Sequence, residues 1–369
     1  MTRIDHVYIH IPFCHRICPY CSFHKHRAES INLDDFVDAV LLELDERKAD
    51  FEVIPKTVYV GGGTPTFLNT RKLGRLLTGL ADRVDCTQTA EWTVEANPKT
   101  VSASKAHMMC ARGVTRVSLG AQSWSPEELE LLGRDHSPED AVAAFRTLRN
   151  VGIKSINLDL MFSLPSQRLE AWRDTLESVI LLKPDHVSAY NLTYEEDTEF
   201  MLRFRSGDLT ACENRDADLF LAARALLISS GYRHYEISNY AIDGHESLHN
   251  KAYWMGADFL GLGPSAVSTV RGHRWANVAN TDTYISRSKS GQSPIASWES
   301  LSASDRRNEA IALQLRTSQG VDIIHLASKN TETVQRLRDR GMARVEGQKL
   351  CLTDTGLPYV DTIASSLFS

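Results

Sequence analysis

The chain alternates short apolar runs with longer segments in which apolar residues recur at helical spacing. Six runs rich in β-branched residues predict buried strands, at residues 7–11, 57–62, 91–98, 116–122, 155–162 and 186–193. Strands that alternate with helices in this way predict an α/β fold of parallel strands joined by right-handed crossovers. Because the runs are almost wholly apolar, we expect both faces of the sheet to be covered, as in a partial (β/α)6 barrel of the TIM type.

The intervening segments carry signals for the starts and ends of helices. Residues 34–48 repeat apolar positions along one helical face, and Ser-Pro pairs at 125–126 and 137–138 are typical of an N-cap followed by a first-turn proline. Glycines at 152 and 231 follow two further helical patterns, where a helix commonly ends. These signals place a helix between successive strands, as the barrel prediction requires.

The alternation of strands and helices stops near residue 235, and this divides the chain into three predicted regions. Residues 1–235 form the barrel core. Residues 236–300 form a mixed accessory region rich in aromatic residues and glycine, and its serine-rich end at 286–304 predicts a linker. Residues 301–369 show helical patterns at about 305–317 and 331–340, a hairpin-like stretch at 343–353 and a final helix, which together predict a small winged-helix-like domain.

Composition and charge exclude several classes of function. The 369 residues are 42% hydrophobic and 24% charged, as is ordinary for a globular protein, and the net charge is −6. Neither this charge nor the nearly balanced C-terminal region provides the basic surface that nucleic-acid binding needs. The first residues include no apolar run typical of an export signal, and no stretch reaches the length of an integral membrane segment. We therefore predict a cytoplasmic protein that does not bind nucleic acid.

Three of the seven cysteines lie together in one short stretch, at Cys14, Cys18 and Cys21. In a reducing compartment a disulfide framework is not expected, so the C-x3-C-x2-C spacing indicates a metal site. A Cys3His zinc site is one alternative. The histidines near enough in sequence to complete it are His10, His15, His24 and His26. The other alternative is an iron–sulfur cubane held by three thiolates, in which the fourth iron keeps an open position for a small molecule.

This motif, with Tyr20 before its last cysteine, resembles the signature of the radical S-adenosylmethionine superfamily. In that superfamily, the open iron of a 4Fe-4S cluster chelates S-adenosylmethionine, and one electron cleaves the ligand to a 5′-deoxyadenosyl radical. Further motifs resemble the oxygen-independent coproporphyrinogen III oxidases and their relatives; they are YVGGGTPT at 59–66, EANP at 95–98, SLGAQS at 118–123, LLGR at 131–134 and NLDL at 157–160. The resemblance implies that the three cysteines hold a 4Fe-4S cluster.

The same resemblance implies a set of residues that contact S-adenosylmethionine, and their chemistry suits this role. Glycine allows the backbone to approach a ligand closely, and carboxylates inside apolar strands need partners such as hydroxyl or ammonium groups. An arginine can bind the methionine carboxylate with two parallel hydrogen bonds. The implied residues are Tyr8, Gly62, Gly63, Thr64, Glu95, Gln122, Arg134 and Asp159.

Two features separate the chain from the oxidases that it resembles. The oxidases carry a fourth cysteine two residues after the third, where this chain has Phe23, and they have a longer segment before the cluster loop. The sequence HNKAYW at 249–254 resembles the H-N-x-x-Y-W motif of the HemW branch, the haem chaperones. By this resemblance His249 ligates haem iron while Tyr253 and Trp254 cover the macrocycle. Because the motif follows the six-strand core, we expect haem binding to be separable from cofactor binding.

Three functions stay open at this point, so the sequence does not establish that the protein is an enzyme. The first is a haem chaperone, the second an enzyme of tetrapyrrole metabolism such as a coproporphyrinogen oxidase, and the third a radical methyltransferase. The first implies three cofactors, a 4Fe-4S cluster, S-adenosylmethionine and haem. Its partners would be haem or a porphyrin, a haem-accepting protein, and an electron donor such as flavodoxin or ferredoxin. If the acceptor is membrane-bound, we expect a peripheral contact with the membrane.

Overall fold

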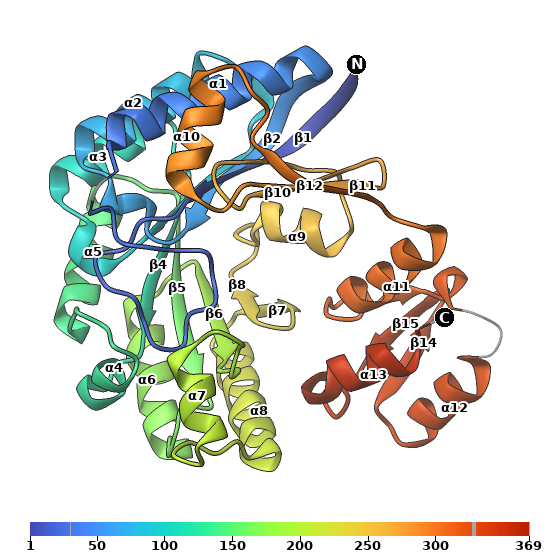
Figure 1. The fold of residues 1–369 in the computed structure, drawn as a ribbon. Coiled ribbons are helices and arrows are strands. Elements are labelled where there is room, and N and C mark those ends of the chain that lie inside the picture. Colours follow the sequence, from blue (N-terminus) through green and yellow to red (C-terminus); the bar gives the residue numbers. More distant parts are fainter. Residues whose placement is uncertain (30, 327–329, 369) are drawn as a thin grey trace.

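A nine-stranded, mainly parallel sheet forms the centre of the molecule (Figure 1). The structure is a computed structural model that describes residues 1–29, 31–326 and 330–368. All six predicted strands are present, as β1 (Thr2–Ile11), β2 (Phe51–Gly62), β3 (Glu91–Ala96), β4 (Arg116–Gln122), β5 (Ser155–Phe162) and β6 (His186–Asn191). They lie side by side in chain order, and each neighbouring pair is parallel. Their carboxyl ends therefore meet along one rim of the sheet.

Three short strands extend this sheet at its two edges. Strand β9 (Leu260–Leu262) pairs in parallel with β1, while β8 (Asn239–Ala241) and β7 (Arg233–Glu236) add antiparallel strands beyond β6. The strand order in the described residues runs from β7 to β9, and these two edges do not pair with each other. The predicted partial barrel is therefore confirmed, and the sheet extends beyond the six strands that the apolar runs predict.

Helices cover the outer face of the sheet (Figure 1). They are α1 (Leu33–Asp50), α2 (Thr70–Ala81), α3 (Ala103–Ala111), α5 (Pro138–Asn150), α6 (Leu169–Leu182) and α8 (Glu213–Ser229). The short helices α4 (Pro126–Leu131) and α7 (Glu199–Arg205) contribute instead to a separate apolar cluster with Met161 of β5. The predicted caps are present, since Ser125 and Ser137 each accept a hydrogen bond from the third backbone N–H of the helix that follows. No helix in the described part of the chain has the length and apolar character that crossing a membrane requires.

The accessory region is more regular than its composition suggests. It contains α9 (Leu248–Trp254), α10 (Thr281–Lys289) and an antiparallel sheet of β10 (Val267–Val270), β11 (His273–Asn277) and β12 (Ile295–Ser300). The prediction of a linker at 286–304 is wrong, because these residues form the end of α10, all of β12 and the start of α11. Trp298 of β12 pairs with Trp275 of β11, so backbone pairing orders a stretch whose serines face largely outward.

The C-terminal residues form a small unit with its own apolar core. It consists of α11 (Ala303–Gln314), β13 (Val321–Asp322), α12 (Thr331–Asp339), β14 (Ala343–Glu346), β15 (Lys349–Leu352) and α13 (Val360–Ser366). The order of helices followed by a hairpin agrees with the predicted winged-helix-like domain. The backbone N–H of Ile237 donates to Arg316 O at 2.7 Å, and that of Ser318 donates to Tyr235 O at 3.0 Å. These bonds attach the unit beside the β7 edge of the core sheet.

Candidate functional site

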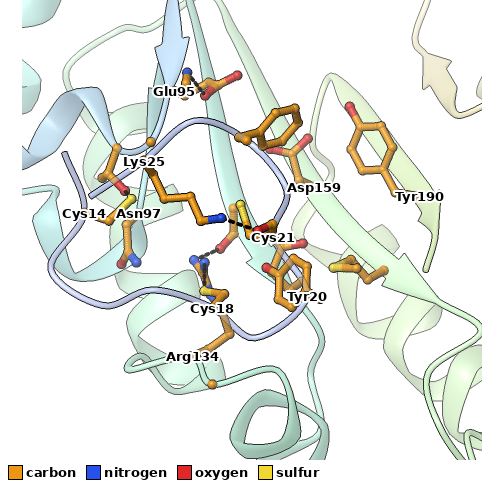
Figure 2. A pocket seen from close by; sticks show the side chains of 18 of the residues that line it. Cys14, Cys18, Tyr20, Cys21, Lys25, Glu95, Asn97, Arg134, Asp159 and Tyr190 are labelled. Carbon is orange, nitrogen blue, oxygen red and sulfur yellow. Dashed lines mark hydrogen bonds between the residues drawn. The ribbon is translucent and has the colours of Figure 1, made fainter. Parts of the chain in front are cut away.

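The three clustered cysteines lie on one loop that follows β1 and faces a cavity. Two backbone hydrogen bonds close the base of the loop, from Cys14 N to His26 O at 3.1 Å and from His26 N to Pro12 O at 2.8 Å. All three cysteines line a cavity of about 480 Å³ at the carboxyl ends of the strands (Figure 2). The spacing in the sequence is therefore realised as three thiols that share one hollow.

Positively charged side chains stand beside the buried thiols. Burial raises the pKa of the Cys14 and Cys21 thiols, and the positive charges of Lys25 and Arg134 oppose this rise at Cys21. Arg134 Nη1 lies 3.6 Å from Cys18 Sγ. Cationic neighbours stabilise thiolates, and thiolates are the form that binds iron.

The histidines near the loop do not complete a zinc site with the cysteines. His10 directs one ring nitrogen to the Tyr8 hydroxyl at 2.9 Å and the other to His24 O at 2.8 Å. His26 uses both ring nitrogens as well, on Arg27 O and Thr281 Oγ1, at 2.8 and 2.7 Å. Within the described residues no group of three His, Cys, Asp or Glu side chains is arranged to hold one metal ion. Because no histidine of the described residues is arranged with the thiols around one ion, three thiols on one loop fit the cluster better than the Cys3His alternative.

Glycines bring the second strand close to the cluster loop. A Cβ on Gly63 would lie 3.0 Å from Cys14 Sγ, and one on Gly62, whose φ is +112°, would lie 2.6 Å from the His10 ring. A larger residue would collide with the loop at position 63 and with His10 of β1 at position 62. The Thr64 hydroxyl, next in the chain, lies 3.5 Å from Cys14 Sγ. The glycine motif thus shapes the cavity wall beside the thiols.

Two partly buried carboxylates stand on neighbouring parts of the same wall. Glu95 Oε1 accepts a hydrogen bond from the Tyr59 hydroxyl at 2.7 Å, and its Oε2 accepts one from Gly62 N at 3.1 Å. Burial raises the pKa of Glu95 to about 7, although the Tyr59 hydrogen bond opposes this rise. Asp159 accepts from Ser118 at 2.8 Å and from Asn157 at 2.7 Å, and burial raises its pKa too. Both carboxylates would gain from a cationic ligand in the cavity.

Arg134 and Gln122 complete this wall from β4 and the turn after α4. Arg134 Nη2 donates to Gly120 O at 2.9 Å, whereas its buried Nε has no hydrogen-bond partner among the described residues. A Cβ on Gly120 would lie 3.0 Å from Gln122 Nε2, so the strand leaves room for both side chains. An unpaired guanidinium nitrogen beside a cavity is suited to an anionic group such as a carboxylate.

A second, larger cavity of about 1190 Å³ adjoins the first, and residues of the HNKAYW sequence line it. His249, Tyr253 and Trp254 lie on α9, whose first N–H groups point to a buried carboxylate. The backbone N–H groups of Leu248 and His249 each donate to Glu91 of β3 at 3.0 Å. The N-terminus of α9 stabilises the negative charge of the Glu91 carboxylate, and the two hydrogen bonds hold α9 against the sheet.

The His249 imidazole is packed inside the core. Its Nδ1 lies 2.7 Å from Thr57 Oγ1, and its ring stacks on Tyr59 with 5.0 Å between centroids. Burial lowers its pKa to about 3, so the ring is neutral at physiological pH. Its Nε2 is buried and has no hydrogen-bond partner in the described part of the chain. A neutral imidazole with one free nitrogen beside a large cavity is suited to ligating a metal.

Comparison with known proteins shows the family of the chain. The model of the Radical SAM superfamily matches residues 8–179. The heme chaperone HemW of Escherichia coli is 40% identical over 266 residues, which cover 70% of this chain and 68% of that protein. The heme chaperone HemW of Lactococcus lactis is 32% identical over 96% of this chain and 92% of its own length. The chain belongs to the HemW family of the radical SAM superfamily.

A solved structure supports the fold of this HemW family member. Coproporphyrinogen III oxidase (HemN) from Escherichia coli superposes with a TM-score of 0.86, at 23% identity, over 100% of this chain and 91% of that chain. At this identity the likeness concerns the fold alone. The superposition extends over the accessory region and the C-terminal unit as well as the barrel, so the whole architecture is shared.

In this HemW family member most residues predicted for S-adenosylmethionine lie around the cysteine cavity. They are Gly62, Gly63, Thr64, Glu95, Gln122, Arg134 and Asp159. Tyr8 differs, because it lies two residues before His10 on β1 and lines only the second cavity. It shares that cavity with Gly62 and Glu95, which line both cavities, and its contact with S-adenosylmethionine stays a prediction.

The premise that the HNKAYW motif lies outside the six-strand core is also wrong. Although α9 follows the six strands in sequence, Glu91, Thr57 and Tyr59 of those strands hold it. Further residues line the cysteine cavity although the sequence predicts no ligand contact for them. These are Lys25, Tyr59, Asn97, Ser118 and Tyr190. Asn97, Tyr59 and Ser118 stand inside the EANP, YVGGGTPT and SLGAQS motifs, which could have identified them, whereas Tyr190 stands in a strand where an aromatic residue ordinarily packs.

Proposed function

We propose that this chain binds haem in the larger cavity and passes it to an acceptor protein, on a scaffold that also holds a cluster and S-adenosylmethionine. The observation that carries the proposal is the free, buried Nε2 of His249 at a cavity of about 1190 Å³, which is large enough for a macrocycle. The relatives that are 32–40% identical are named haem chaperones. His249 is 1% exposed, so ligation requires a neighbouring ring or α9 to move.

The residues of the smaller cavity have distinct tasks in this proposal. The three loop thiols hold the 4Fe-4S cluster, and Phe23, 69% exposed, stands where a fourth cysteine would be. When bound, the cluster supplies one electron to S-adenosylmethionine. Arg134 offers its unpaired Nε to the ligand carboxylate, and Glu95 and Asp159 offer negative charge to its cationic groups. The Gly62 and Gly63 backbone leaves room for the ligand beside the thiols.

The partners follow from this function. A protein that hands on haem needs a haem-accepting protein, and a reducible cluster needs an electron donor such as flavodoxin or ferredoxin. The cytoplasmic location and any peripheral contact with a membrane-bound acceptor stay predictions.

A radical reaction on a tetrapyrrole is the second candidate function, and one observation favours it. The two cavities share part of their walls, including Tyr59, Glu95 and Tyr190. A macrocycle in the larger cavity would thus lie beside the cofactor. This candidate keeps the same two binding sites and adds a chemical step between them.

One experiment separates the two functions. Cluster-loaded protein, reductant and S-adenosylmethionine are incubated either with haem and an apo-haem protein or with coproporphyrinogen III. We expect haem to appear in the added apo-protein and coproporphyrinogen to be recovered unchanged. Stoichiometric conversion of coproporphyrinogen to protoporphyrinogen would place the oxidase first, and failure of haem to bind would refute the chaperone.

A further inference from the structure

Tyr59 of β2 contacts both cavities through different parts of its side chain. Its hydroxyl donates to Glu95 Oε1 at 2.7 Å on the side of the cysteine cavity. Its ring stacks on His249 on the side of the larger cavity, with 5.0 Å between centroids and 30° between planes. One side chain thus connects Glu95, which lines both cavities, with the imidazole of the larger cavity.

The backbone holds this connection tightly. A Cβ on Gly61 would lie 2.7 Å from Tyr59 Cε1 and 2.9 Å from Glu95 Cδ, so the two side chains pack directly on the β2 backbone. On the far side of Glu95, Gly62 N donates to Oε2 at 3.1 Å. Because the carboxylate holds the Tyr59 hydroxyl and the Gly62 N–H together, a ligand that draws Glu95 toward itself must also affect the Tyr59 hydrogen bond.

His249 is restrained on its other side as well. Its Nδ1 lies 2.7 Å from Thr57 Oγ1, and the same hydroxyl lies 2.9 Å from His6 Nδ1. The His249 backbone N–H donates to Glu91 at 3.0 Å. The imidazole is therefore fixed at Nδ1 and at the backbone, and the stacked Tyr59 ring is the neighbour that leads toward the cysteine cavity.

We propose that Tyr59 couples the two cavities, so that S-adenosylmethionine bound beside Glu95 changes the affinity of the His249 cavity for haem. This inference rests on the proposed function and assigns it a regulator. Binding at one site alters the partner of the Tyr59 hydroxyl, the ring shifts against His249, and the imidazole becomes easier or harder to release toward iron. Thermodynamic linkage requires haem to change S-adenosylmethionine affinity by the same factor.

The test measures haem affinity of the cluster-loaded protein with and without saturating S-adenosylmethionine, by titration of the haem Soret band. In the natural protein we expect S-adenosylmethionine to change the haem dissociation constant by about fivefold or more, since about fivefold is the lower end of ordinary allosteric coupling. Tyr59→Phe keeps the stacked ring and loses the bond to Glu95, so its change should fall below about twofold at saturation. An unchanged haem affinity in the natural protein, or a Tyr59→Phe variant that keeps the full change, overturns the proposal.

Tyr190→Phe is the matched control. Tyr190 also lines both cavities, but its hydroxyl bonds to Ser188 instead of Glu95. We expect this variant to keep the coupling. If it loses the coupling to the same extent, any hydroxyl of the shared wall suffices, and the assignment to Tyr59 is wrong.

A second measurement does not depend on haem. The ¹³Cε1 resonance of His249, assigned with His249→Ala, is recorded in haem-free protein with and without S-adenosylmethionine. A shift in the natural protein that Tyr59→Phe abolishes supports the coupling, and no shift refutes it. If haem fails to bind at all, the chaperone function falls while this resonance still decides the coupling.

Discussion

The ionisation of Glu95 makes a quantitative prediction for S-adenosylmethionine binding. Burial raises the pKa of this carboxyl to about 7, so close to half of the molecules carry a neutral Glu95 at neutral pH. A cationic ligand beside the carboxyl favours its ionised form. If the bound state is fully ionised, affinity scales with the ionised fraction in the free protein, which rises about tenfold between pH 6 and pH 8.

The assay compares dissociation constants for S-adenosylmethionine in the natural protein and in Glu95→Gln, both cluster-loaded, at pH 6, 7 and 8. Titration of the ligand itself affects both proteins equally, so the ratio of their affinities isolates Glu95. Glutamine can still accept from Gly62 N and bond with the Tyr59 hydroxyl, so the cavity wall should keep its shape. We expect the ratio to change about tenfold in favour of the natural protein from pH 6 to pH 8. A ratio independent of pH would refute the reasoning.

Further variants test other parts of the account. Replacing any one of the three loop cysteines by alanine should abolish the 4Fe-4S absorption of reconstituted protein, and one zinc per chain without a cluster would contradict the assignment. Arg134→Ala should weaken S-adenosylmethionine binding by about tenfold or more while cluster absorption persists, because one charge-assisted contact is lost; unchanged affinity would show that the arginine is misassigned. Glu91→Ala should lower the free energy of unfolding by about 2 kcal/mol, since two α9 N–H groups lose their acceptor, and an unchanged denaturant midpoint would contradict that anchor. In ligand-free protein, the raised pKa of Glu95 contributes stability at a pH below the pKa of the unfolded state, and this stability is lost as the pH rises through about 7. Glu95→Gln should therefore gain thermal stability relative to the natural protein above about pH 7. An equal difference in thermal stability at pH 4 and pH 8 would contradict this argument.

The sequence predicts the parts of the fold that rest on local patterns. The six long strands are apolar runs, and the helix caps at Ser125 and Ser137 depend on neighbouring residues alone. Strands β8 and β9 have three residues each, which is too short for a pattern to appear, and their place in the sheet depends on distant partners. The sequence does not predict β12, because its serine-rich composition is typical of a linker and its pairing with β11 depends on residues outside the segment.

The cysteine cavity was predictable for a related reason, and the larger cavity was not. Residues at the carboxyl ends of adjacent parallel strands must meet, so the motifs of β2 to β5 converge on the loop thiols. By contrast, the contacts of His249 with Thr57 and Tyr59 join residues almost two hundred positions apart. Tyr59 opens the YVGGGTPT motif, but only the fold shows that its hydroxyl donates to Glu95. Tyr8 stands in the apolar run of β1, and only the fold shows that its side chain lines the larger cavity.

The central claim is that haem binds at the HNKAYW cavity, and a haem titration of His249→Ala tests it most directly. His107→Ala, which removes an exposed imidazole on α3, is the matched control. The account predicts that His249→Ala lowers haem affinity at least about tenfold or changes the Soret band, while cluster absorption stays the same and His107→Ala behaves as the natural protein. Haem binding with the natural affinity and spectrum in His249→Ala would contradict the account.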